Sequence, residues 1–149
     1  MRLAGVFGVR LAAAKGVAAR TPGALRVGDN RAVSTSVLIV DDHPSFRASA
    51  RRMLEASGYA VVGEAADGEA AIAAAGALDP DLVLLDVQLP DLDGFEVAGR
   101  IAALGKGPAI VLTSSREGSD FGAAIAESPA RGFIAKSELS SESLAELAG

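Results

Sequence analysis

Short apolar runs alternate with alanine-rich stretches along most of this 149-residue chain. Five of these runs are predicted to be strands, at residues 37–41, 60–65, 82–86, 109–113 and 132–135. Alternating strands and helices are typical of repeated βαβ units, in which helices cover both faces of a parallel sheet. The sequence therefore predicts an α/β protein with a doubly wound, five-stranded parallel sheet and five helices.

Local signals mark the ends of several predicted helices. Pro44 suits the first turn of a helix, because its missing N–H is not needed there, and Gly58 suits the end of that helix. The Asp79-Pro80 pair is expected to end the second helix before the third strand begins. The predicted helices cover residues 44–57, 69–75, 94–104, 119–127 and 140–148.

The two ends of the chain differ in charge. Residues 1–36 hold six basic side chains and one acidic one, whereas residues 37–149 hold eight basic and eighteen acidic ones. We expect residues 1–35 to be a basic, disordered extension, or a segment that is present only because translation is taken to start at an upstream codon. A targeting segment or weak attachment to a membrane surface are the alternatives. Residues 36–149 are expected to form a single domain.

Composition excludes several classes of function. The chain has no Cys, which excludes disulfides, thiolate catalysis and zinc-thiolate sites and fits a cytoplasmic location. Its apolar runs have the length of strands, far below the roughly 20 residues that span a membrane. The acidic body should repel phosphates, so we expect no direct nucleic acid binding and no membrane insertion.

Charged side chains follow three of the predicted strands. Asp41 ends the first and Asp42 follows it, Asp86 ends the third, and Lys136 follows the fifth. The carboxyl ends of parallel strands meet at one edge of the sheet, where such folds bind their ligands. Acids facing one lysine suit Mg²⁺ and a phosphoryl group, although an Asp-Asp pair can also merely cap a helix.

Two further features lie at this edge. Thr113, Ser114 and Ser115 end the fourth strand and offer a hydroxyl to the same phosphoryl group. His43 is the only histidine, which excludes a two-histidine metal site, and we expect it to face solvent or to start a helix.

Residues 36–148 resemble the receiver domain of two-component response regulators, a CheY-like and flavodoxin-like fold. Within that group they are most similar to receivers of the nitrate-regulator type. The resemblance implies the strand order 2-1-3-4-5. It depends on four motifs in order: VLIVDDHP, DLVLLDVQLPDLDG, IVLTSS and GFIAK.

The resemblance implies a role for each residue at the strand ends. Asp86 would be the phosphoacceptor, Lys136 would contact the phosphoryl group, and Asp41 and Asp42 would hold Mg²⁺ with Asp86. The backbone carbonyl of Gln88 would be a further metal ligand.

Two residues would form the switch. Ser114 fits the switch hydroxyl better than Thr113, because it lies 28 positions after Asp86 and 22 before Lys136, although a shift of one residue exchanges them. Phe133 would be the aromatic residue that rotates inward, and simple core packing in the fifth strand is its alternative. Gln88 and Arg116 flank the site, where they could influence hydrolysis of the acyl phosphate.

The implied function is signal transduction. A sensor histidine kinase would phosphorylate Asp86, and the fourth helix, fifth strand and fifth helix would then control a downstream protein effector or form a dimer. The chain would have no enzymatic activity beyond its own phosphorylation and dephosphorylation. It would act as a stand-alone receiver or as a fragment of a longer regulator.

Two other functions are alternatives to this one. A Mg²⁺-dependent phosphatase with an aspartate nucleophile usually carries an Asp-x-Asp pattern, but Gln88 stands where a second acid would follow Asp86. A receiver-like interaction module that no longer takes phosphate is disfavoured, because Asp42, Asp86, Ser114 and Lys136 are all present.

Overall fold

The computed structural model describes residues 34–116 and 118–148. Most of the predicted basic extension, residues 1–33, lies outside the described residues. Within the described part of the chain, no helix is both long enough and apolar enough to cross a membrane.

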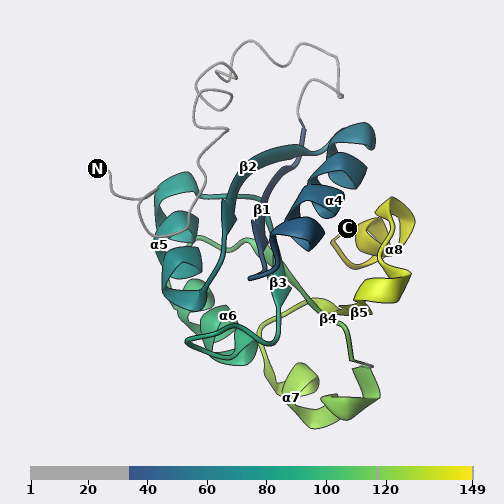
Figure 1. Ribbon diagram of the computed structural model, residues 1–149. Coiled ribbons are helices and arrows are strands. Elements are labelled where there is room, and N and C mark those ends of the chain that lie inside the picture. The colour runs from purple at the N-terminus through teal and green to yellow at the C-terminus, as the bar shows by residue number, and fades with distance from the viewer. Residues whose placement is uncertain (1–33, 117, 149) are drawn as a thin grey trace.

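The sheet has the predicted order and direction. Its five strands are β1 (Ser36–Val40), β2 (Ala60–Ala65), β3 (Leu82–Asp86), β4 (Ala109–Ser114) and β5 (Gly132–Ala135). They lie in the order β2-β1-β3-β4-β5, and every neighbouring pair is parallel. The predicted doubly wound α/β fold is therefore confirmed (Figure 1).

Five α-helices surround the sheet in the described residues. They are α4 (Pro44–Ala56), α5 (Gly68–Leu78), α6 (Gly94–Ala103), α7 (Gly122–Glu127) and α8 (Ser141–Ala148). Helices α4 and α8 cover one face and α5 and α6 the other, with α7 beside β5 (Figure 1). Two short 3₁₀ turns, η2 (Gly118–Asp120) and η3 (Lys136–Glu138), precede α7 and α8.

Alternation along β1 explains the two hydrophobic cores. Val37 and Ile39 pack with α4 and α8, whereas Leu38 and Val40 pack with α5 and α6. Because both faces of the sheet are covered, the central strands are continuous apolar runs with no polar face.

The element boundaries differ slightly from the prediction. Strand β1 ends at Val40, so Asp41 is the first residue beyond it. Helix α5 begins one residue earlier and ends three residues later than predicted, and the Asp67 carboxylate fixes its start by accepting a hydrogen bond from the Ala70 amide. Asp79, with a positive φ of 49°, ends the helix.

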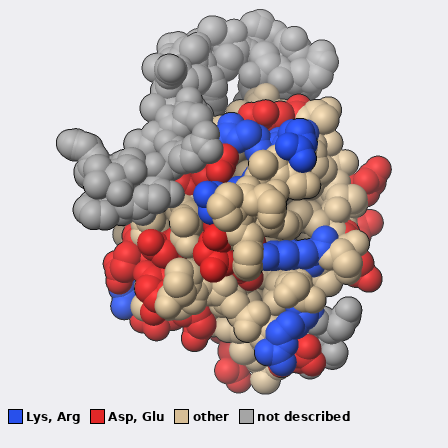
Figure 2. Space-filling view, in the orientation of Figure 1, with Lys and Arg blue, Asp and Glu red and all other residues tan. Residues whose placement is uncertain are grey.

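Acidic side chains dominate one side of the molecule. On the face shown in Figure 2 they gather over α5 and α6. Glu69, Asp91, Asp93 and Glu96 are exposed residues of this region.

Candidate functional site

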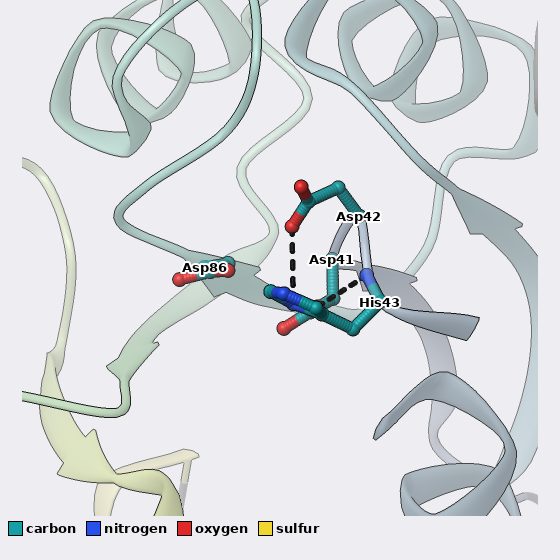
Figure 3. Close-up of side chains that lie close together, drawn as sticks. All are labelled: Asp41, Asp42, His43 and Asp86. Carbon is teal, nitrogen blue, oxygen red and sulfur yellow. Dashed lines mark hydrogen bonds and ion pairs between the residues drawn. The ribbon is translucent and has the colours of Figure 1, made fainter. Parts of the chain in front are cut away.

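Adjacent strands bring Asp41 and Asp86 together. Val40 is in register with Leu85, so the two aspartates that follow leave β1 and β3 side by side. Both carboxylates are buried. As predicted, the two acids lie close together at the carboxyl edge of the sheet (Figure 3).

Four potential metal ligands gather at this edge. Asp41, Asp42, His43 and Asp86 each offer one ligand atom, and these atoms lie within 4.8 Å of one another. Asp42 and His43 are exposed, with 36% and 64% of their side chains accessible. The cluster therefore has a buried side made of protein and an open side that water can reach.

His43 joins the two acids of the first loop. Its backbone N–H donates to Asp41 Oδ1 at 2.8 Å, and its Nδ1 lies 3.0 Å from that oxygen and 3.1 Å from Asp42 Oδ1. It also stands at the N-cap of α4, although its side chain caps no backbone amide there. As predicted, His43 is exposed and lies at the start of a helix.

Lys136 brings a positive charge to the same edge from β5. Its Nζ lies 2.6 Å from Asp41 Oδ2 and 3.5 Å from Asp86 Oδ2. It also lies 4.5 Å from the centroid of the Phe46 ring, at the start of α4. An ammonium beside two carboxylates and an aromatic face has its position fixed from several sides.

The Asp86 carboxyl is strongly perturbed by its surroundings. Burial and, to a smaller extent, the nearby negative charge of Asp41 raise the pKa of Asp86 from 3.8 to about 6. The backbone N–H of Gln88, 3.1 Å from Asp86 Oδ1, and the Lys136 ammonium oppose this rise. A crowded, desolvated carboxylate is strongly stabilised by a cation.

The donor set fits a hard divalent cation. Carboxylate oxygens are the ligands that Mg²⁺ prefers, and Mg²⁺ usually keeps several waters when it binds a protein. Here Asp41 and Asp86 supply buried carboxylates, and Asp42 lies at the solvent boundary. The single positive charge of Lys136 does not balance the charges of three ionised acids. The remaining negative charge favours binding of a metal ion.

Thr113 and Ser114 are both buried but have different partners. Thr113 is in register with Asp86, and its Oγ1 has no hydrogen-bond partner among the described residues. Ser114 Oγ accepts a hydrogen bond from the Arg116 backbone N–H at 3.0 Å. Successive side chains of a strand point to opposite faces, so Thr113 shares the face of Asp86 and Ser114 does not.

The remaining predicted residues lie around the centre. Phe133 is half-buried on the α5 and α6 face, with its ring centroid 5.7 Å from that of Phe121. Phe121 in turn lies 5.9 Å from Phe95, and the Arg116 guanidinium lies 5.4 Å from the Phe121 ring centroid. Phe133 is thus one end of a row of three aromatic rings.

Asp91, which the sequence did not mark as a functional residue, holds the loop after β3. Asp91 accepts hydrogen bonds from the backbone N–H groups of Gly68 and Glu69, at 2.7 and 3.0 Å. Desolvation opposes the change, but these hydrogen bonds lower the pKa of Asp91 below its ordinary value. Asp91 therefore ties the loop that carries Gln88 to the start of α5. The acid-rich DLDG sequence after Pro90 was the only signal.

Comparisons with known proteins agree with this geometry. Residues 37–148 match the response regulator receiver domain family. A putative transcriptional regulator from Pseudomonas aeruginosa is 37% identical over 110 residues, which are 74% of this chain and 53% of that protein. The chain thus spans about half the length of this relative.

Two solved structures have the same fold. One is a LuxR-family two-component response regulator from Aurantimonas sp., with a TM-score of 0.71 and 34% identity over 78% of this chain and 87% of that one. The other is the signal receiver domain of the putative response regulator NarL from Mycobacterium tuberculosis. Its TM-score is 0.69, with 33% identity over 77% of this chain and 96% of that one. The chain belongs to the response regulator receiver domain family.

Proposed function

We propose that the chain accepts a phosphoryl group on Asp86 from a sensor histidine kinase and thereby transmits a signal in the cytoplasm. The observation that carries this proposal is the position of the Asp86 carboxylate, buried beside Asp41 and 3.5 Å from the Lys136 ammonium. The receiver domain is proposed to cover residues 36–149, with residues 1–35 as a separate basic extension.

Mg²⁺ would be held by Asp41, Asp42 and Asp86, together with the backbone carbonyl of Gln88. When bound, the cation would offset the charge of the three acids and of the incoming phosphoryl oxygens. Asp86 would attack phosphorus through a carboxylate oxygen, forming an acyl phosphate while the bond to the donor breaks. Lys136 would then leave Asp41 in part and pair with a phosphoryl oxygen.

Ser114 is proposed as the switch hydroxyl, and Thr113, one residue away, is its alternative. Ser114 lies on the face of Phe133, because Leu112, two residues earlier in β4, pairs with Phe133 and packs in the same core. Thr113 is in register with Asp86, and its buried Oγ1 has no hydrogen-bond partner within the described residues. A phosphoryl oxygen would relieve the cost of such an unpartnered hydroxyl.

Movement of the Ser114 hydroxyl would be passed to Phe133, which lies on the same face of the sheet. Phe133 would rotate inward, and the surface formed by α7, β5 and α8 would then bind a downstream protein effector or a second copy of the chain. Acidic charge around α5 and α6 disfavours direct binding of nucleic acid by this domain. We propose no enzymatic activity beyond phosphorylation and dephosphorylation of Asp86.

Acetyl phosphate with Mg²⁺ tests the proposal directly. Intact mass spectrometry should detect one added phosphate on the parent protein and none on Asp86→Asn, whereas Asp120→Asn, an exposed control, should be modified like the parent. Retention of the phosphate in Asp86→Asn would contradict the assignment. Steady turnover of phosphate esters would instead indicate a phosphatase.

A pair of alanine variants tests the hydroxyl. Ser114→Ala should still be phosphorylated but should lose the chemical-shift change of the Phe133 ring that accompanies phosphorylation. Thr113→Ala should keep that change. The opposite result would give the switch role to Thr113.

A further inference from the structure

A buried carboxylate outside the acidic cluster joins two arginines of α4. Glu64 in β2 is 3% exposed. Its Oε1 lies 3.0 Å from Arg47 Nε and its Oε2 lies 2.8 Å from Arg51 Nε. The two arginine side chains are themselves only 12% and 22% exposed. This group, which we call the Glu64 triad, connects the second strand to the helix that follows the first.

Within the triad, Arg47 also reaches the acidic loop. Its Nη1 donates a hydrogen bond of 2.7 Å to the backbone carbonyl of Asp41. The Arg47 side chain therefore binds the loop of Asp41 and Asp42 where it leaves β1, while Glu64 holds the guanidinium from the other side.

Stability alone is a weak reason for such a triad. Removing charged groups from water costs several kcal/mol per ion, and apolar replacements of a buried ion pair are often neutral or stabilising. In addition, Arg51 Nη2 is buried without a hydrogen-bond partner among the described residues. What the triad does provide is a planar guanidinium fixed at two points, which holds the carbonyl that it contacts in one place.

We propose that Arg47, oriented by Glu64, is a positioning residue for the Mg²⁺ centre. Through the Asp41 carbonyl it fixes the direction in which the loop leaves β1, and with it the carboxylates of Asp41 and Asp42. This inference rests on the proposed Mg²⁺ site and adds to it a residue that touches neither the metal nor the phosphoryl group. Partners that orient metal ligands typically change metal affinity by about 10 to 100-fold when they are removed.

Electrostatics alone predicts the opposite sign. Arg47 is a positive charge next to an acidic cluster, so its removal should strengthen the attraction of the cluster for Mg²⁺. Loss of positioning should weaken the binding. The direction of the change therefore separates the two effects.

The test is isothermal titration of the metal-free protein with MgCl₂, for the parent and three variants. Arg47→Met, which keeps an apolar stem, should bind Mg²⁺ about tenfold more weakly. Arg47→Lys keeps the charge but cannot bridge Asp41 and Glu64, so it should be weakened to a similar extent. Arg51→Met loses its contact with Glu64 but leaves the Asp41 carbonyl bonded, and should bind within about twofold of the parent.

Thermal unfolding of the same proteins provides the second measurement. Arg47→Met and Arg51→Met each lose a contact with Glu64, so both should unfold at lower temperature, while only the Arg47 variants lose Mg²⁺ affinity. Unchanged or tighter Mg²⁺ binding by folded Arg47→Lys would overturn the inference, as would equal weakening in Arg51→Met. A parent protein that binds no Mg²⁺ would instead overturn the proposed metal site itself.

Discussion

Helices α4 and α7 both follow loops that leave the carboxyl edge of the sheet, but they are held to the domain very differently. Helix α4 has thirteen residues, buries Ala50 and Leu54, and is ion-paired to β2 through the Glu64 triad. Helix α7 has six residues, and none of its described side chains is buried or caps its first turn. One half of the edge is therefore fixed and the other is weakly anchored.

This difference separates two tasks. A metal centre needs ligands that hold one geometry, and the acidic loop lies on the α4 side. A switch needs an element that opens at low free-energy cost, and such elements come from the least stable parts of a domain. We therefore expect the α7 side to respond to phosphorylation and the α4 side to stay as it is.

The largest expected effect compares one apolar side chain from each helix. Leu54→Ala should lower the free energy of unfolding by about 3 kcal/mol, because Leu54 is fully buried and its loss leaves a cavity. Ile125→Ala in α7 should cost less than about 1 kcal/mol. Urea unfolding followed by circular dichroism measures both values. Equal losses would show that α7 is as firmly packed as α4.

A pair of glycines gives a smaller effect. Gly94 and Gly122 are the first residues of α6 and α7. A Cβ atom at Gly94 would lie 2.5 Å from the Asp86 carbonyl oxygen, whereas one at Gly122 would meet nothing within 4 Å. Gly94→Ala should therefore destabilise the protein by about 2 kcal/mol, because backbone must move.

Gly122→Ala serves as the matched control for Gly94→Ala. It should leave stability unchanged or raise it by up to about 1 kcal/mol, because alanine favours a helix more than glycine does. The same urea measurement applies. A loss at Gly122 as large as that at Gly94 would contradict an open position at the start of α7.

The smallest effect concerns pH and the metal-free protein. The pKa of Asp86 rises from 3.8 to about 6 on folding, so the folded state keeps this proton at a pH where the unfolded chain has lost it. The stabilisation that comes from protonated Asp86 is fully present below pH 3.8 and is lost as the pH rises through about 6. Asp86→Asn should thus be more stable than the parent by about 1 to 2 kcal/mol at pH 7.5.

Unfolding at two pH values checks this expectation. The advantage of Asp86→Asn should disappear near pH 4, and Mg²⁺ at pH 7.5 should reduce it by stabilising the ionised parent. Asp120→Asn, next to α7, should show no comparable change with pH. An advantage of the same size at both pH values would mean that ionisation of Asp86 is not its cause.

Periodicity and local signals were sufficient for the architecture. Buried strands such as Leu82–Asp86 are continuous apolar runs, and Pro44, Gly58 and Asp79 mark element ends through backbone preferences that act locally. The carboxyl-edge position of Asp41, Asp86 and Lys136 followed from the strand assignments, because parallel strands all end on one side. The exact start of α7 did not follow, since no capping residue marks it.

Residue types and their order along the chain therefore determined the fold, the family and the acids and lysine of the candidate centre. The tertiary structure decided that Thr113 is the residue in register with Asp86, because one residue of register moves a side chain to the other face of a strand. It also brought Arg47, Glu64 and the Asp41 carbonyl together. These groups belong to three different elements, and contacts between elements depend on packing that local sequence patterns do not encode.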